Sequence, residues 1–212
     1  MDLDLDIEEI EFSADLPEES YDSEYDEAEE GKGSGKIKKE KKENPVLEWV
    51  KVIAIAVAVA LVINFVVIIN STVPTGSMED TIQAGSRVIG LRVVYWFTEP
   101  QRGDIVVFKN PDNTSQLYIK RIIGEPGDTV EIKKGVTYIN GEALDEPYLR
   151  ETPAAEDFGP YNVPEGHYFA MGDNRNSSLD GRYWNNKYIP RDYILGKAGL
   201  CYWPLDRIGV LK

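Results

Sequence analysis

The sequence predicts a mostly β fold of antiparallel, strongly bent sheets, preceded by one transmembrane helix and a disordered acidic tail. Three observations support this prediction. Residues 1–30 are strongly acidic, residues 52–69 form one apolar run, and the residues that follow contain short β-branched segments separated by turn signals. A length of 212 residues leaves room for one globular domain beside the tail and the helix.

The formal net charge of −14 arises entirely from the N-terminal segment. Residues 1–30 contain 15 Asp or Glu and no Lys or Arg, so the rest of the chain carries a net charge of +1. A segment of this composition buries too little apolar surface to offset the entropy of ordering, and we expect it to be a disordered tail. The near-neutral remainder lacks the positive charge on which nucleic-acid binding depends, so no nucleic-acid partner is expected.

The apolar run at residues 52–69 reads VIAIAVAVALVINFVVII and contains one polar residue, Asn64. As a helix it would be about 27 Å long, close to the thickness of the hydrocarbon core of a bilayer. A cleaved signal peptide would have a shorter apolar region and a small-x-small site, and a buried core helix would show a polar face. We therefore expect a transmembrane helix over residues 46–70.

A basic linker over residues 31–45 precedes this helix. Six lysines stand in it, and five of them lie close to the helix, at positions 36, 38, 39, 41 and 42. Lysine and arginine close to a membrane span stay in the cytoplasm. We therefore expect a single-pass protein of the cell membrane with a cytoplasmic N-terminus, in which residues 71–212 form an extracytoplasmic domain.

The outer domain contains segments rich in β-branched and aromatic residues, bounded by turn signals, as is typical of strands. We expect strands at residues 104–108, 117–123 and 130–132. Glycine-containing turns that join antiparallel strands are predicted at residues 126–128, 134–135 and 140–141. Little helix is expected outside the anchor.

The chain contains one cysteine, Cys201, and one histidine, His167. A single cysteine excludes a disulfide within the chain, and its apolar and aromatic neighbours predict a packed structural site. A single histidine leaves no His-rich metal cluster. We expect neither a metal nor a cofactor.

Ser77 is the first candidate for chemistry. It stands in the segment VPTGSM, seven residues beyond the predicted helix, and so lies at most about 25 Å from the end of the span. A serine after glycine is also common in ordinary turns. Its hydroxyl becomes a good nucleophile only beside a base.

Lys120 is the better of two candidate bases. His167, which a Ser-His-Asp arrangement would need, follows a Pro-Glu-Gly turn at the start of a predicted strand, and this favours a structural or surface role. In a strand over residues 117–123, alternation places Lys120 on one face with Tyr118 and Ile122, and these neighbours would desolvate its amine. The ordinary pKa of about 10.4 has to fall by about 2–3 units for a base at neutral pH. The alternative is a lysine at a strand edge with its ammonium in water.

Four segments in order behind the anchor resemble the sequence boxes of bacterial type I signal peptidases: PTGSM at 74–78, RGDIVVF at 102–108, YIKRIIGEPGD at 118–128 and GDNRNSSLDGRYW at 172–184. With the anchor, the resemblance extends from about residue 46 to the C-terminus. It implies a signal-peptidase-type β-fold and a membrane-bound serine endopeptidase that removes N-terminal signal peptides from exported preproteins at Ala-x-Ala-like sites. Secretory preproteins and the lipid bilayer are then its partners, with the protein export machinery as a further candidate.

The resemblance also assigns roles to single residues. Ser77 is the nucleophile and Lys120 its general base. The hydroxyl of Thr75, which stands where the family often has serine, joins the backbone N–H of Ser77 in stabilising the oxyanion. Ser178 orients the lysine amine. Supporting polar structure is expected from four residues: Arg121, Asp173, Asp180 and Arg182.

Shallow apolar pockets for small side chains at the first and third residues before the cut are implied by a further set of matching positions: Val73, Pro74, Met78, Ile82, Tyr118 and Ile119. The chain departs from the family's pattern at Asp80, which replaces a proline two residues after Met78. Without the proline ring, the sequence does not establish whether the backbone is rigid at this point. The replacement does not affect the implied chemistry.

Other functions have to be weighed against a peptidase. An anchored β-domain without catalytic activity could bind exported chains or cell-wall partners, and replacing Lys120 would then change nothing. A self-cleaving repressor with a similar β-fold would carry a DNA-binding module, and residues 1–45 contain no helix-turn-helix pattern. A penicillin-binding Ser-x-x-Lys enzyme is excluded at Ser77, because Asp80 stands three residues later.

Overall fold

The computed structural model describes residues 45–212. The predicted acidic tail over residues 1–30 lies outside the described residues. The predicted basic linker over residues 31–45 also lies outside them, except for its last residue.

An apolar helix opens the described part of the chain. It consists of α1 (Pro45–Val62), which continues as the π-helical η1 (Ile63–Val67). Together they form a helix of 23 residues that is long and apolar enough to cross a membrane. The helix ends before the predicted boundary at residue 70, because the next residues form β1 (Ile68–Thr72), which pairs along its whole length with β2 (Arg87–Leu91).

Beyond β2 the described chain is mostly strand. The strands are β3 (Ile105–Asn110), β4 (Asn113–Gly124), β5 (Thr129–Lys133), β6 (Val136–Ile139), β7 (Glu142–Ala143), β8 (Phe158–Asn162), β9 (His167–Met171), β10 (Ile189–Pro190), β11 (Ile194–Trp203) and β12 (Gly209–Val210). The short helical elements are α2 (Val94–Phe97), η2 (Arg175–Ser177), η3 (Arg191–Tyr193) and η4 (Leu205–Arg207).

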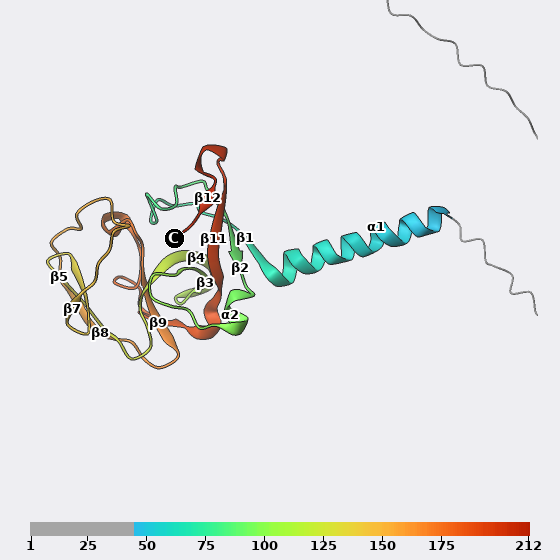
Figure 1. Ribbon diagram of the computed structural model, residues 1–212. Helices are drawn as coiled ribbons and strands as arrows, with labels where there is room; N and C mark the ends of the chain where they lie inside the picture. Colours follow the sequence, from blue (N-terminus) through green and yellow to red (C-terminus); the bar gives the residue numbers. More distant parts are fainter. Residues whose placement is uncertain (1–44) are drawn as a thin grey trace, which may run out of the picture. The chain divides into compact units, whose positions relative to one another are not determined.

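The strands form two sheets. The first has the order β1-β2-β11-β3-β4-β9-β10, with β12 paired to β11, and the second has the order β7-β6-β5-β8. All of these pairs are antiparallel. Figure 1 shows β5, β7 and β8 to the left of β1, β2 and β11. The predicted mostly β, antiparallel fold is confirmed.

Two predicted turns join strands of the second sheet. Lys134 and Gly135 connect β5 to β6 with φ values of 50° and 81°. Asn140 and Gly141 connect β6 to β7 with φ values of 51° and 88°. Positive φ at both central residues is the geometry that a two-residue hairpin requires, which explains the glycine and asparagine.

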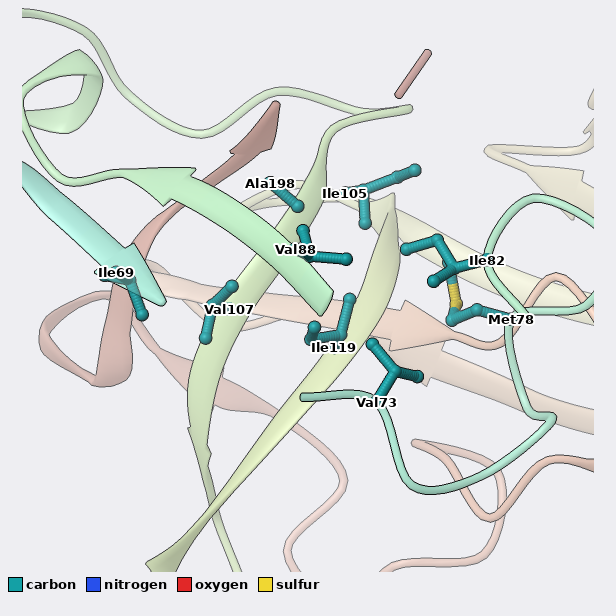
Figure 2. Packing of buried hydrophobic residues seen from close by; sticks show 9 residues of the cluster. All are labelled: Ile69, Val73, Met78, Ile82, Val88, Ile105, Val107, Ile119 and Ala198. Atoms are coloured by element: carbon teal, nitrogen blue, oxygen red, sulfur yellow. The ribbon is translucent and has the colours of Figure 1, made fainter. Parts of the chain in front are cut away.

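Strand β3 is buried on both faces. Ile105 and Val107 belong to one core cluster, whereas Val106 and Phe108 belong to a second. Figure 2 shows the first cluster, in which side chains from several strands of the first sheet meet Val73 and its neighbours in the β1–β2 connection. Register shifts interrupt the ladders of β11 with β2, β11 with β3, β3 with β4 and β4 with β9, and such bulges bend the strands around the two clusters.

A buried arginine connects the two sheets. Arg175 donates to Thr137 Oγ1 in β6 at 2.9 Å and to the carbonyl oxygen of Gly172, just after β9, at 3.1 Å. It also forms an ion pair with Glu146, in which Arg175 Nη2 lies 2.5 Å from Glu146 Oε1 and both side chains are buried. The hydroxyl of Tyr148 donates to the same carboxylate at 2.7 Å. Glu146 therefore satisfies two buried donors at once.

Removing this carboxylate should destabilise the protein strongly. We expect Glu146→Ala to lower the free energy of unfolding by about 3–5 kcal/mol, because it leaves the Arg175 guanidinium buried and unpaired. Glu131→Ala is the matched control, since it removes an exposed ion pair with Lys133 and should cost about 0–1 kcal/mol. Urea titration in detergent solution measures both values. Equal losses in the two variants would contradict this account of Glu146.

Candidate active site

Ser77 lies in the connection between β1 and β2, and its side chain is 6% exposed. The base of this connection is closed by hydrogen bonds from Val73 N to Ser86 O at 2.9 Å and from Gly85 N to Val73 O at 2.7 Å. Inside it, Ile82 N donates to the carbonyl oxygen of Met78 at 2.8 Å. These contacts fix the backbone on both sides of the serine.

The side chains of Met78 and Ile82 hold this turn against the body of the domain. Both are fully buried in the first core cluster, and Figure 2 shows them side by side, next to Val73 and Ile105. Met78, directly after Ser77, therefore fixes the turn to the hydrophobic core. The position of the serine hydroxyl therefore depends on core packing.

The amine of Lys120 donates a hydrogen bond to Ser77 Oγ, across 43 positions of the sequence. Lys120 lies in β4, opposite Val106 in β3, and is 4% exposed. This burial lowers the pKa of Lys120 from 10.5 to about 8, while the carboxylates of Asp180 and Asp173 act in the opposite direction. A neutral amine, able to accept the proton of the serine hydroxyl, is therefore accessible close to neutral pH.

Two further predicted residues lie beside this pair. Thr75 Oγ1 donates to Ser77 Oγ at 3.3 Å. Ser178 is buried, and its hydroxyl has no hydrogen-bond partner in the described structure, so the expected bond to the Lys120 amine is not formed in this state. A Cβ at Gly172 would collide with both Ser178 Oγ and the carbonyl oxygen of Ser77. The absence of a side chain at Gly172 thus leaves room for Ser178 and for the backbone of Ser77 to pack against this residue.

Two buried ion pairs lie near the site, and they are formed by the four residues for which the resemblance implies supporting polar structure. Arg121 binds Asp173 with two hydrogen bonds, of 2.9 Å and 2.7 Å, and Thr81 Oγ1 donates to the same carboxylate at 2.6 Å. Arg182 likewise binds Asp180 with two hydrogen bonds, of 2.8 Å and 2.9 Å. The network connects the nucleophile turn, β4 and the loop after β9.

A cleft of about 400 Å³ opens over Ser77 and Lys120. It is lined by residues 71–77 on one side and 117–120 on the other, together with Ser177 and Leu179. Of the predicted pocket residues, four line the cleft: Val73, Pro74, Tyr118 and Ile119. The other two, Met78 and Ile82, lie in the core cluster and are not among the lining residues.

Two exposed residues that line the cleft, Leu117 and Leu179, were not among the residues predicted from the sequence. Leu117 could have been found, because it precedes Tyr118 in a predicted strand. No signal marked Leu179, which stands in a loop between Ser178 and Asp180.

Unpaired strand edges border the cleft on both sides. Among the strands of residues 45–212, β1 is the end strand of its sheet and pairs with β2 alone. Within the same residues, the first part of β4, up to Lys120, pairs with β3 alone, because its ladder with β9 begins at Arg121. The cleft can therefore accept an extended peptide as an additional strand.

Asp80, which replaces the family's proline, accepts a hydrogen bond from Arg150 Nη1 at 2.7 Å. Both side chains are exposed. An exposed ion pair thus links the nucleophile turn to the loop that follows β7.

The two residues predicted to be structural lie outside the cleft. His167 begins β9 and pairs with Pro190, and its Nδ1 lies 2.9 Å from the carbonyl oxygen of Glu165. Cys201 is buried in β11 and its thiol donates to Trp203 O at 3.2 Å.

Comparisons with known proteins identify the family of this chain. A family model described as signal peptidase, peptidase S26, matches residues 46–203. The chain is 41% identical over 183 residues to a probable signal peptidase I-2 of Synechocystis, covering 84% of this chain and 83% of the relative. It is 39% identical over 181 residues to signal peptidase I T of Bacillus subtilis, covering 81% and 93%.

A crystal structure of a signal peptidase I from Enterococcus faecalis is 36% identical in sequence, with a TM-score of 0.41 over 47% of this chain and 97% of that chain. The match to the family model covers most of the described residues, and the relatives are similar over most of their own length. The chain belongs to the signal peptidase family.

Proposed function

We propose that this protein is a membrane-bound signal peptidase I that cleaves secretory preproteins after their signal peptides, with Ser77 as the nucleophile and Lys120 as the general base. The observation that carries the proposal is the hydrogen bond between the buried Lys120 amine and Ser77 Oγ in the lining of a cleft. Membership of the family supports the activity, and the contact supports the mechanism.

The reaction begins when the neutral amine of Lys120 accepts the proton of the Ser77 hydroxyl as the oxygen attacks the scissile carbonyl. The backbone N–H of Ser77 and the hydroxyl of Thr75 stabilise the oxyanion, in keeping with the position of Thr75 beside Ser77 Oγ. The ammonium of Lys120 then donates its proton to the departing amine. The neutral Lys120 amine then takes a proton from a water molecule. This water hydrolyses the acyl-enzyme and releases the signal peptide.

The substrate binds as an extended strand between β1 and the first part of β4, whose edges are unpaired at the cleft. Val73 and Ile119 are buried, line the cleft and leave only a small apolar surface exposed, which suits small side chains before the cut. This arrangement supports the Ala-x-Ala preference that the family resemblance implies.

The apolar helix anchors the enzyme in the cell membrane, with the N-terminus in the cytoplasm and the active site on the outer side. The lysines at positions 36–42 precede the helix, and this charge distribution supports the orientation. A signal peptide is itself held in the bilayer, so tethering the enzyme raises the effective concentration of both partners. The export machinery is a further candidate partner.

Replacing either member of the proposed dyad should abolish cleavage. We expect Ser77→Ala and Lys120→Ala each to lower kcat/KM by at least about 10³-fold, because each removes a group that acts as a unit with the other. Lys133→Ala, at an exposed lysine of β5, is the matched control and should keep full activity. Cleavage of an Ala-x-Ala preprotein, followed by electrophoresis, measures the effect. Full activity in the Lys120 variant would overturn the role of Lys120 as the general base.

The rate should rise with pH. Lys120 acts as a base only when neutral, and burial lowers its pKa to about 8, so kcat/KM should increase through about pH 8 and level off above it. Stopped assays with a soluble peptide over pH 6–10, a range on the order of two units either side of this pKa, give the profile. The variant His167→Gln should leave it unchanged. An inflection that disappears in that variant would indicate that histidine is the base instead.

A side chain at Gly172 should disturb the site without a change to any reacting group. We expect Gly172→Ala to lower kcat about 10²-fold, because its Cβ collides with Ser178 Oγ and the Ser77 carbonyl and displaces the dyad. Gly199→Ala is the control, since its Cβ would meet only Ile89 O at 3.9 Å. Circular dichroism establishes that both variants are folded. Equal activities in the two would show that the contacts of Gly172 do not position the serines.

A further inference from the structure

We propose that Asn174, in the loop after β9, is a positioning residue for the oxyanion site. Its side chain and its backbone N–H bind the two peptide groups on either side of Ser77 and so fix the direction of the Ser77 N–H. The inference rests on the proposed function, because it concerns the oxyanion that forms during cleavage. No step of the reaction described above uses Asn174.

Two hydrogen bonds join Asn174 to the nucleophile turn. Asn174 Nδ2 donates to the carbonyl oxygen of Gly76 at 3.1 Å, across 98 positions of the sequence. Asn174 N donates to the carbonyl oxygen of Ser77, also at 3.1 Å. One residue therefore holds both the peptide group that precedes the nucleophile and the peptide group that follows it.

The bond to Gly76 sets the direction of the oxyanion donor. The Gly76 carbonyl and the Ser77 N–H belong to one peptide group, which is trans. Such a group is planar, and its C=O and N–H point in opposite directions. A donor that holds the carbonyl oxygen therefore fixes the N–H on the opposite side. It also polarises the peptide group, which strengthens that N–H as a donor.

The Ser77 N–H is available to a substrate, because within residues 45–212 it donates to no protein acceptor. Glu79 N also donates to the Gly76 carbonyl at 3.1 Å, so this oxygen has two donors. Glu79 belongs to the same turn as Ser77 and moves with it. Asn174 instead ties the peptide group to a distant loop, and so to the rest of the domain.

The loop that carries Asn174 is itself held in place. The preceding residue, Asp173, accepts hydrogen bonds from Arg121 in β4 and from Thr81. The carbonyl oxygen of Asn174 accepts a hydrogen bond from Ser177 N at 3.1 Å. A donor that is fixed before the reaction begins costs no reorganisation when the negative charge develops, and this is the condition for effective stabilisation of an oxyanion.

Asn174 acts from outside the cleft. It is not among the residues that line the cleft over Ser77 and Lys120. It borders instead a small polar hollow of about 60 Å³, together with Asp80 and Arg150. Its loss should therefore weaken the stabilisation of the transition state without a change in the binding of the substrate.

The kinetics of cleavage test this role with two substitutions. Asn174→Ala removes the side-chain donor, and Asn174→Asp keeps the size of the side chain but replaces the donor with an acceptor. Each should lower kcat for an Ala-x-Ala preprotein about tenfold, less than the roughly 10²–10³-fold loss that follows removal of an oxyanion donor itself, and KM should change less than about twofold. The inflection of the pH profile at about 8 should stay, because Lys120 is unchanged.

Asn176→Ala is the matched control. The side chain of Asn176 lies in the same loop, but it binds Ala154 N at 2.8 Å and Thr152 O at 3.2 Å. This variant should keep the wild-type kcat, and circular dichroism establishes that all three variants are folded. An equal loss in the control, or a moved inflection in the Asn174 variants, would overturn the proposal, because either result indicates a general disturbance of the loop or of the dyad.

A tetrahedral adduct reports on the oxyanion site directly. Ser77 Oγ attacks a peptide aldehyde that ends in Ala-x-Ala: the O–C bond forms, the carbonyl π bond becomes the oxyanion, and the serine proton passes to the Lys120 amine. The matching peptide alcohol has no carbonyl at this position and binds without a covalent bond. In Asn174→Ala, the inhibition constant should rise about tenfold for the aldehyde and less than about twofold for the alcohol. Equal changes for the two inhibitors would overturn the role of Asn174 at the oxyanion.

These measurements separate a failure of this inference from a failure of the proposed function. If the wild type cleaves the preprotein and Asn174→Ala cleaves it with the same kcat, Asn174 does not position the oxyanion donor, and the peptidase function stands. A wild type that does not cleave the preprotein would overturn the proposed function, and with it the oxyanion on which the role of Asn174 depends.

Discussion

The withdrawal of one amine from water is the constraint on which the rest of this structure depends. Lys120 is buried in β4 opposite Val106, and this burial brings its pKa to about 8. The fall of the pKa from 10.5 means that the protein disfavours the charged ammonium over the neutral amine by roughly 3 kcal/mol, relative to water. Strands β3 and β4 hold the lysine away from water because apolar side chains cover both faces of the sheet there.

The ion pairs near the dyad matter for the same reason. The carboxylates of Asp180 and Asp173 favour the charged form of Lys120 and so raise its pKa. Each is held in two hydrogen bonds by an arginine, Arg121 or Arg182, which offsets the negative charge that the amine experiences. The two ion pairs thus order the loop after β9, and the pKa of Lys120 still stays below its ordinary value.

The sequence predicted what depends on local pattern. Alternation placed Lys120 among apolar neighbours, and the residue pairs Lys134 with Gly135 and Asn140 with Gly141 marked hairpins, because such features are set within a few residues. The contact of Lys120 with Ser77 was implied only by family resemblance, since no periodicity connects positions so far apart. The Arg175 link to Glu146, the rim residue Leu179 and the unbonded hydroxyl of Ser178 depend on how loops pack, and loops carry no repeating signal.

The replacement of a proline by Asp80 shows which interaction positions the nucleophile. The ion pair of Asp80 with Arg150 is exposed, so it contributes at most about 1 kcal/mol and is screened by salt. The buried side chains of Met78 and Ile82 contribute about 1.5–3 kcal/mol each. Core packing therefore outweighs the ion pair severalfold. Because the turn is held by its apolar side chains, the chain could lose a proline at this point and keep Ser77 in reach of the lysine.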